Sequence, residues 1–385
     1  MCGNNFSKQL IISLIIFSIC FSEAPTHGLE SIQKDFTTDG LTISNIIAWD
    51  VIVYKGYLFV AAESSVEIFN LKSNKYNPPH VKSIPRVEEE TTITDIYVNQ
   101  DILCVSMSGY IHLYNVSNPY YAYEFCQIPH NGGNVRDFYI EGNLLFVCNT
   151  IMGFKIYDIS IPSAPILLSS TLIGDSINEV YVVDNFAFIV SDYSITDTRI
   201  FAVLEITNPS FPVLTYESNY NYNYSLHDIY SNGNIIYLFG EDGLFVYDFD
   251  GATTELLKHI NTILIIDYAI KGSFMYAINL PAHVIEFNIS IFNNPIITNS
   301  YLGGYSSALD LYEDNIYLAA SDDGVLVINT NYIYPPTTTP IPTTLTNTSK
   351  TYSINVSLSS TTLTITFSII AMITLVAYKK RNDLK

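Results

Sequence analysis

Acidic residues recur in this chain at one place in a repeated pattern, each inside a short apolar stretch. Successive acids are 39 to 49 residues apart, which leaves room for about four short strands in each copy. Repeats of this length are typical of the blades of a propeller. We therefore predict an all-β, seven-bladed β-propeller with four-stranded blades. The seven acids are Asp50, Asp95, Asp137, Glu179, Asp228, Asp267 and Asp310.

The strands of one copy can be read from the first repeat. AWDVIVY begins at Ala48 and is followed by a Lys55-Gly56 turn, by YLFVAA and by VEIFN, which ends at Asn70. These stretches are rich in β-branched and aromatic residues and are too short for helices. In later copies a proline turn leads to a fourth strand, such as ILLSST from Ile166. Because proline lacks a backbone N–H, this strand is expected at the outer edge of its sheet.

Two turns between the second and third strands carry an Asp-Gly pair, at residues 242–243 and 323–324. Asp-Gly between two apolar strands is typical of a type I′ turn, whose twist matches that of the strands. We expect type I′ hairpins at both places.

Closure of the ring is predicted from the two ends of the repeat region. The seventh copy supplies three strands before Pro335, and residues 30–44 precede the first acid as a fourth strand would. Propellers close by placing strands from both ends of the chain in one sheet, which leaves no open edge. We therefore expect the N-terminal segment to form the outer strand of the last blade.

The third strand and the turn after it resemble the LVIVD repeat of β-propeller proteins on prokaryotic, especially archaeal, cell surfaces. FKIYDISIPSAPILL from Phe154 is the copy most similar to that repeat, and the resemblance covers roughly residues 45 to 331. It implies a propeller fold but no single chemistry, because this fold serves many functions. The second, fifth and sixth copies depart from the pattern, and the fifth replaces the proline turn with DFDGATTE from Asp248.

The regions outside the repeats predict a protein displayed at the cell surface. Lys8 followed by an apolar run is typical of a secretory signal, whereas an uncharged stretch near the other end, followed by basic residues, is typical of a single-pass anchor. A Thr/Pro/Ser-rich segment between propeller and anchor is typical of an extended stalk. We assign residues 1–28 to the signal peptide, 29–334 to the propeller, 335–360 to the stalk, 361–378 to a transmembrane helix and 379–385 to a cytoplasmic tail.

Five Asn-x-Ser/Thr sequences in the exported part are candidate glycosylation sites. Two of them, Asn115 and Asn288, also end third strands, where an amide bonded to the adjoining turn is an equally good explanation. The five candidates are Asn115, Asn223, Asn288, Asn347 and Asn355.

The chain is strongly acidic, with 17 Lys and Arg against 37 Asp and Glu and a formal net charge of −20. A surface of this charge repels phosphate backbones, so nucleic acid is not an expected partner. Such a surface can attract cations or basic partners instead.

The seven repeated acids would lie on the innermost strands, around the central tunnel. One interpretation is a carboxylate ring that binds Ca²⁺ or another cation. The alternative is structural: each carboxylate accepts backbone N–H groups in its own blade. Placement in every blade favours the structural role, because a binding site usually occurs once.

Tyrosines cluster with asparagines in the one long connection between blades, YESNYNYNYSLHDIY from residue 216. Exposed Tyr and Asn are typical of protein or carbohydrate recognition, although tyrosines of an outer strand alternating with solvated asparagines would give the same pattern. The candidate ligand-binding residues are Tyr216, Tyr220, Tyr222 and Tyr224.

No catalytic motif stands out. The histidines lack metal-ligand spacing, and the sequence contains neither a Gly-x-Ser-x-Gly elbow nor a Cys-x-x-Cys pair. Of the three cysteines in the exported part, two could form a disulfide, or Cys104 and Cys148 could be small buried apolar residues.

These features predict a membrane-anchored cell-surface propeller that acts as an interaction or adhesion module for a protein or carbohydrate. No cofactor is expected, apart from Ca²⁺ in the ring of acids. Two alternatives remain open: an extracellular hydrolase or lyase that acts on glycans, and a structural component of the cell envelope.

Overall fold

A computed structural model of the chain describes residues 42–330, except 45, 88–92, 94, 108, 131, 174–176, 192–198, 221–224, 263 and 281–282, together with residues 352–358 and 361–367. The chain divides into two compact units, Met1–Ile333 and Tyr334–Lys385.

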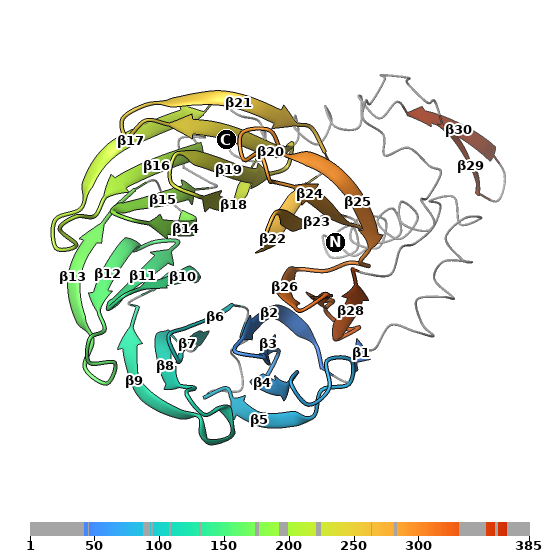
Figure 1. Ribbon diagram of the computed structural model, residues 1–385. Coiled ribbons are helices and arrows are strands. Elements are labelled where there is room, and N and C mark those ends of the chain that lie inside the picture. The colour runs from blue at the N-terminus through green and yellow to red at the C-terminus, as the bar shows by residue number, and fades with distance from the viewer. Residues whose placement is uncertain are drawn as a thin grey trace, which may run out of the picture. The chain divides into compact units, whose positions relative to one another are not determined.

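The first unit is a ring of seven four-stranded antiparallel sheets, which confirms the predicted seven-bladed propeller (Figure 1). Each of the first six blades uses four consecutive strands, which run in order from the inner to the outer edge of the sheet. Blade one contains β2 (Ala48–Tyr54), β3 (Tyr57–Ala62), β4 (Ser65–Asn70) and β5 (His80–Pro85). Blade two contains β6 (Ile96–Asn99), β7 (Ile102–Met107), β8 (Tyr110–Asn115) and β9 (Tyr123–Pro129). A short 3₁₀ helix, η1 (Pro119–Tyr121), lies between β8 and β9.

The remaining blades repeat this order. Blade three contains β10 (Val135–Glu141), β11 (Leu144–Asn149), β12 (Gly153–Asp158) and β13 (Ile166–Thr171). Blade four contains β14 (Ile177–Val183), β15 (Phe186–Ser191), β16 (Arg199–Glu205) and β17 (Val213–Tyr220). Blade five contains β18 (Leu226–Ser231), β19 (Ile235–Gly240), β20 (Gly243–Phe249) and β21 (Thr254–Ile260). Blade six contains β22 (Ile265–Lys271), β23 (Phe274–Asn279), β24 (His283–Asn288) and β25 (Ile296–Leu302). Blade seven contains β26 (Ala308–Tyr312), β27 (Asn315–Ala319), β28 (Val325–Asn329) and β1 (Thr42–Ile43).

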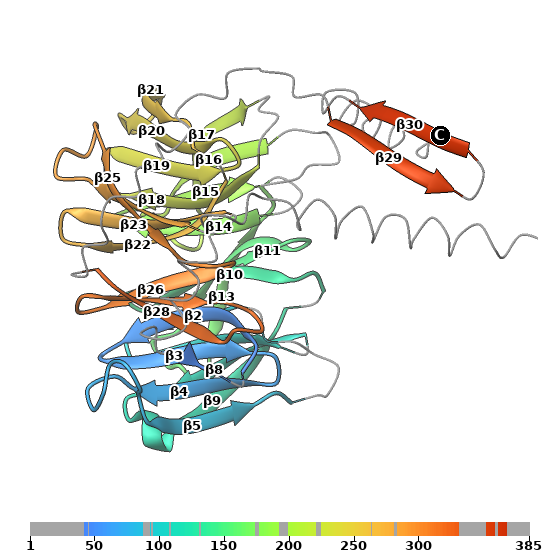
Figure 2. The same ribbon diagram turned by 90° about the vertical axis from the view of Figure 1, so that its right-hand side faces the viewer.

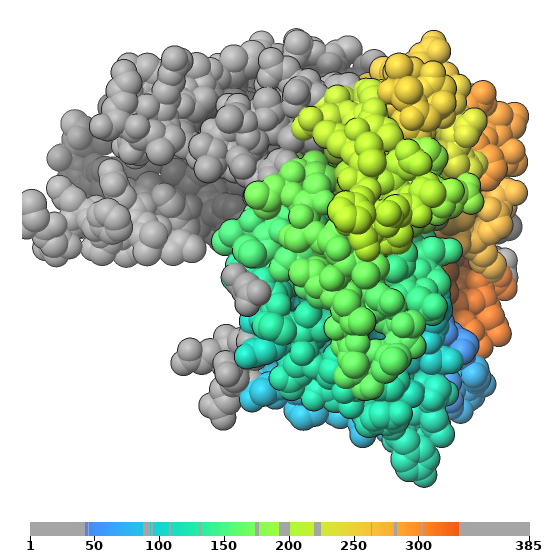
Figure 3. Space-filling model, turned by 90° about the vertical axis from the view of Figure 1, so that its left-hand side faces the viewer, coloured from blue at the N-terminus to red at the C-terminus, as the bar shows by residue number. Residues whose placement is uncertain are grey.

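Burial changes from the inner to the outer strand of each blade. The second strands are covered on both faces, and in β3 the side chains of Leu58, Phe59 and Val60 are fully buried. This explains why the second strands read as continuous apolar runs. The outer strands are mostly exposed, as in β13, where Ile166 and Leu167 face solvent. Figures 2 and 3 show the stacked blades from the side and the outer wall of the ring.

The hydrophobic core is divided into seven clusters, one at each contact between neighbouring blades. In the contact between blades one and two, Phe59 and Ile68 pack with Leu103 and Val105. No blade buries its faces alone, so each depends on both neighbours. Three cysteines lie in or near these clusters as free thiols: Cys104, Cys126 and Cys148.

The expected closure of the ring is confirmed. Strand β1 pairs antiparallel with β28, with Thr42 opposite Leu326 and Ile43 opposite Val325. A backbone bridge between Ala48 and Ser321 follows. Gly324 has φ +78°, and a Cβ atom there would lie 2.0 Å from the carbonyl oxygen of Ile43. The closing strand can therefore approach this turn only because residue 324 is glycine.

The two Asp-Gly turns are not type I′, so that expectation was wrong. A type I′ turn needs positive φ at both central residues. In the turn before Gly243, positive φ occurs at the glycine but not at Glu241 or Asp242, and in the other turn it occurs at Ser321 and Gly324. Paired positive φ values are found instead in turns between first and second strands, at Lys55-Gly56 and at Gln100-Asp101.

The second unit contains an antiparallel hairpin of β29 (Tyr352–Leu358) and β30 (Thr361–Phe367). The first seven residues of the expected transmembrane helix thus form a strand, and part of the expected stalk pairs with it. Residues 368–378 lie outside the described residues. Across the described ranges, no helix combines the length and apolar character needed to cross a membrane.

Removing β1 should loosen the whole ring, because the outer edge of β28 would lose the strand that pairs with it. We expect a soluble propeller that starts at residue 45 to melt at least roughly 3 °C below one that starts at residue 29. Thermal unfolding followed by circular dichroism measures the difference. A matched protein that starts at residue 40 retains β1 and should melt like the longer one; equal melting of all three would contradict the role of β1.

Candidate functional site

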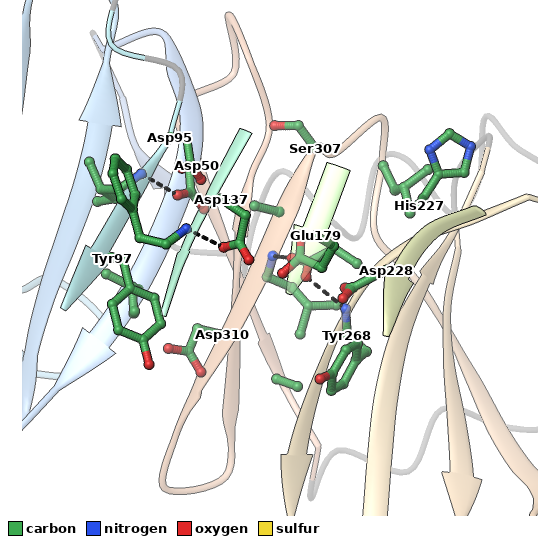
Figure 4. A pocket seen from close by; sticks show the side chains of 18 of the residues that line it. Asp50, Asp95, Tyr97, Asp137, Glu179, His227, Asp228, Tyr268, Ser307 and Asp310 are labelled. Atoms are coloured by element: carbon green, nitrogen blue, oxygen red, sulfur yellow. Dashed lines mark hydrogen bonds between the residues drawn. The ribbon is translucent and has the colours of Figure 1, made fainter. Parts of the chain in front are cut away.

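The inner strands enclose a central cavity of about 680 Å³, and all seven acids predicted from the sequence line it. Figure 4 shows the side chains of Tyr97 and Tyr268 at this space, together with the carboxylates of Asp50, Asp95, Asp137, Glu179, Asp228 and Asp310. The predicted acids are therefore brought together from seven blades. Their hydrogen bonds decide what they can do there.

Four of the acids join neighbouring blades through backbone N–H groups. Asp50 accepts the N–H of Val51 at 2.7 Å through Oδ1, and through Oδ2 it accepts the N–H of Ile96 in the second blade at 3.0 Å. Asp137 does the same with Phe138 at 2.6 Å and with Val180 of the fourth blade at 2.9 Å. Each carboxylate satisfies an inner-strand donor in its own blade and one in the next.

Two more carboxylates continue this arrangement around the ring. Asp267 accepts the N–H of Tyr268 and, at 2.6 Å, that of Leu309 in the seventh blade. Asp310 accepts the N–H of Leu311 and, at 2.6 Å, that of Val53 in the first blade. These four carboxylates thus form hydrogen bonds between neighbouring blades. The sequence predicted hydrogen bonds within one blade only.

The seventh acid does not occupy the position that the other six share. Asp50 lies four residues before the end of its strand and is opposite Ala61. In blade seven the corresponding position is Ala308, and Asp310 lies two residues further along, opposite Tyr317. The sequence repeat aligns Asp310 with the other acids. In the structure, the turn between the first and second strands decides which residues face each other, and it places Ala308 at the shared position. Residues two apart share a strand face, so Asp310 still lines the cavity.

Burial raises the pKa of these carboxyl groups above its ordinary value. For Asp50 the pKa rises from 3.8 to about 6, and for Asp137 and Asp310 to about 7, with the backbone N–H bonds opposing the rise. Burial, together with neighbouring carboxylates, also raises the pKa of Asp95 and Glu179 well above the ordinary range. Oδ2 of Asp95 is buried and accepts no hydrogen bond from the described residues.

Tyrosines form a second layer of the cavity wall. Tyr97, Tyr139 and Tyr181 each lie two residues after an acid, and their ring centroids are 5.8 and 5.5 Å apart in turn. Tyr230, which does not line the cavity itself, continues the series at 5.3 Å from Tyr181, and Tyr268 of the cavity wall follows at 5.8 Å. Sequence reasoning missed this arc, although a tyrosine two residues after the acid in four copies was a usable signal.

A third set of cavity residues comes from irregularities in the inner strands. In five blades the pairing of the first and second strands shifts just before the acid, which leaves one residue without a partner on the neighbouring strand. Such bulges turn a side chain away from its regular direction. All five of these bulge residues line the cavity, and they were not identified from the sequence: Trp49, Arg136, Asn178, His227 and Ile266.

The bulge residues differ in chemistry from blade to blade, whereas the acids beside them are alike. They present an indole, a guanidinium, an amide, an imidazole and an alkyl group. Trp49 is 37% exposed and Arg136 is also exposed. The cavity therefore combines a repeated structural layer with a non-repeated layer that reaches solvent.

Metal binding by the acid ring has no further support in the geometry. Within the described ranges, which include all seven acids, no group of three or more His, Cys, Asp or Glu side chains is placed to hold a metal ion. Calcium binding by the ring stays a prediction.

The tyrosine cluster of the long connection is only partly described. Tyr216 is half-buried: its ring packs against Phe201 and Phe249, and its hydroxyl lies 2.6 Å from Oγ1 of Thr254 in the next blade. It therefore belongs to a blade contact rather than to an exposed surface. Tyr220 ends β17, and Tyr222 and Tyr224 lie outside the described residues.

The candidate glycosylation sites are also partly described. Asn115 accepts the N–H of Ser117 and donates to the hydroxyl of Tyr123, and Asn288 accepts the N–H of Ser290, so both amides hold turns. Asn355 lies in β29, whereas Asn223 and Asn347 are outside the described residues.

Comparison with protein families finds the LVIVD repeat at residues 47–78 and 132–172. The second range contains the stretch from Phe154 that resembles this repeat most in the sequence. None of the curated proteins matches the chain.

Solved structures share the fold at low sequence identity. The chain is similar to a protein in the crystal structure of the mitotic checkpoint complex, with a TM-score of 0.60, 11% identity and coverage of 75% of this chain and 92% of that one. It is similar to the WD40 β-propeller domain of Doa1, with a TM-score of 0.58, 11% identity and coverage of 75% and 94%. A protein from Lactobacillus plantarum gives a TM-score of 0.59, 11% identity and coverage of 69% and 88%.

The raised pKa values predict that the propeller is more stable in mild acid. Between pH 4 and 7 the folded state binds more protons at Asp50, Asp137 and Asp310 than the unfolded state, whose carboxyl groups titrate near 3.8. The free energy of unfolding therefore falls as pH rises through this window. We expect a higher melting temperature at pH 5 than at pH 8, and a smaller difference in Asp137→Asn. A melting temperature that rises from pH 5 to pH 8 would contradict this.

Removing a blade-joining carboxylate should cost more than removing Asp95. Asp137→Ala leaves the buried N–H groups of Phe138 and Val180 without an acceptor, and we expect a loss of about 2–5 kcal/mol in the free energy of unfolding. Asp95→Ala removes a carboxylate from the same ring whose Oδ2 accepts no bond from described residues, and we expect about 1 kcal/mol or less. Urea unfolding of both variants measures the difference, and equal losses would refute the blade-joining role.

Proposed function

The chain is an LVIVD-repeat β-propeller, and we propose that it is a recognition or adhesion module displayed outside the cell. Its binding site is the solvent-reaching part of the central cavity, and its ligand is a basic group carried by a surface protein or a glycan. The support comes from the cavity wall, the charge of the chain and the segments that flank the propeller.

The observation that carries the proposal is the contrast between the acids and the bulge residues beside them. A structural role repeats from blade to blade, as the blade-joining carboxylates do. A binding surface needs different groups in different places, and Trp49, Arg136, Asn178, His227 and Ile266 provide them on one rigid frame. Trp49 and Arg136 are large, exposed side chains of the kinds that dominate binding energies.

Charge complementarity favours a basic ligand. Carboxylates line the cavity, and tyrosine rings beside them can contact a cation through their faces. The chain carries a formal net charge of −20, so a basic partner is also attracted over longer distances. Arg136 then contributes specificity, because it favours partners that also present a hydrogen-bond acceptor at that place.

The cell-surface location rests on the flanking segments. Residues 10–22 are typical of the apolar part of a secretory signal. Residues 361–378, the first seven of which form β30 in the structure, carry no charge and are followed by Lys379, Lys380 and Arg381. The Thr/Pro/Ser-rich residues before this stretch would hold the propeller away from the membrane. Protease treatment of intact cells tests the location: the propeller should be removed from the outside, while the basic tail stays with the membrane fraction.

Capture from cell-surface extracts tests recognition itself. Soluble residues 29–336, crosslinked to bound material with and without Ca²⁺, should capture one partner saturably. Trp49→Ala and Arg136→Ala should each weaken capture at least about tenfold, since exposed Trp and Arg anchors contribute the most. Tyr305→Ala removes an exposed aromatic ring that does not line the cavity and should leave capture unchanged. Capture of the chain only by itself would instead favour an envelope component.

One observation favours a second function, cleavage of glycans. Burial and the neighbouring charge of Asp137 raise the pKa of Glu179 well above its ordinary value, and the side chains of these two residues interact directly. A buried carboxyl group with a raised pKa is a candidate general acid, the group that a glycosidase uses to protonate the leaving oxygen. Cleavage of surface glycans that is lost in Glu179→Gln, with the melting temperature retained, would establish this alternative.

A further inference from the structure

A second cavity, of about 380 Å³, lies between the first two blades. Its walls come from the Lys55 turn and the start of β3 on one side and from the loop around η1 on the other. The volume is within the range of about 300–1,000 Å³ that small-molecule sites occupy. The lining residues are Tyr54, Lys55, Tyr57, Lys72, Val116, Ser117, Asn118, Pro119 and Tyr120.

The charge of this cavity is opposite to that of the central one. Two lysines line it in a chain that has only 17 basic residues. Lys55 is paired with Asp101 at 2.7 Å, so its charge is balanced. Lys72 forms no ion pair with the Asp and Glu residues that the structure describes. An unbalanced ammonium group therefore lines the cavity.

The position of Lys72 is fixed by the residues under it. Its Nζ lies 4.8 Å from the centroid of the Tyr57 ring, and its backbone N–H is accepted by Oδ1 of Asn70 at 3.0 Å. The side chain also passes over Gly56, where a Cβ atom would lie 2.7 Å from Cε and 2.8 Å from Cγ of Lys72. The lysine stem thus lies directly against Gly56, with its ammonium over the Tyr57 ring.

Aromatic and polar groups complete the wall. Tyr57 and Tyr120 meet edge to face at 6.4 Å, and the hydroxyl of Tyr120 accepts a hydrogen bond from Nδ2 of Asn70 at 3.1 Å, which holds its ring in place. Tyr120 is 48% exposed, and Ser117 and Asn118 are exposed beside it. A flat aromatic ring next to hydroxyl and amide groups suits the apolar face and the hydroxyl groups of a sugar.

We infer that this cavity binds a sugar carrying an anionic group, with the ring of Tyr120 under the sugar and the ammonium of Lys72 against the anion. The ligand is a negatively charged hexose unit, and its anionic group can be a carboxylate or a sulfate. The site lies apart from the central cavity and shares no lining residue with it. A glycan could therefore be held here whether or not the central cavity binds a basic partner.

Calorimetric titration of the full chain in detergent tests the inference. The probes are an oligosaccharide that contains glucuronate, its carboxyl-reduced neutral counterpart and a sulfated oligosaccharide of the same length. We expect saturable binding of the glucuronate probe, the sulfated probe or both, and at least tenfold weaker binding of the neutral one. Equal binding of the neutral probe, or no saturable binding of either anionic probe, would overturn the inference.

Variants of the lining residues separate this site from charge effects elsewhere. Lys72→Met keeps a stem that packs on Gly56 and Tyr57 but removes the charge, and it should weaken binding of the anionic probe at least tenfold. Tyr120→Leu should weaken the anionic and neutral probes alike. Lys82→Met removes a positive charge from β5 of the same blade, outside the cavity, and should leave binding unchanged. Unchanged binding in Lys72→Met, with a melting temperature equal to the parent's, would refute the site.

Discussion

The backbone N–H groups on the innermost strand of each blade need acceptors, and this requirement shapes the centre of the molecule. The inner strand of a blade has no neighbouring strand on its tunnel side, so its polar groups face the adjacent blades and the cavity. Asp50, Asp137, Asp267 and Asp310 meet the requirement across four blade contacts. At the other contacts, Asn99 donates to the carbonyl of Ile140, Asn178 to that of Leu226 and Tyr268 to that of Ile229. Every blade contact thus has a side-chain hydrogen bond near the centre, in addition to its apolar cluster.

This way of joining blades places carboxyl groups where charge is unfavourable. Burial raises their pKa values, while the two N–H bonds to Asp50 or Asp137 act in the opposite direction. With pKa values of about 6 for Asp50 and about 7 for Asp137 and Asp310, these three carboxyl groups are partly ionised near neutral pH. A structural solution therefore has an electrostatic consequence: negative charge remains in the cavity, although its carboxylates are there to hold the blades.

The same frame presents two surfaces of different character. Around the central cavity, bulges just before the acids direct five unlike side chains inward, so the frame repeats while the contact groups vary. Between the first two blades, Lys72 and Tyr120 line a smaller cavity of opposite charge. A propeller that must pack seven similar blades can vary only the residues that its packing does not use. Bulges and loops are those residues, which is why both candidate sites are built from them.

The sequence by itself determined the number of blades, the order of their strands and the strand that closes the ring. These follow from local patterns: a repeated length, apolar runs, and a seventh copy that lacks one strand. The tertiary structure alone decided which residues meet. It showed that Asp310 is displaced by two positions, because the turn at Glu313 and Asp314 sets the register rather than the acid. It brought Lys72 to a loop of the next blade and placed the ring of Tyr216 in a blade contact. Contacts between blades depend on packing across about 40 residues of sequence, and no local pattern encodes which side chains face each other there.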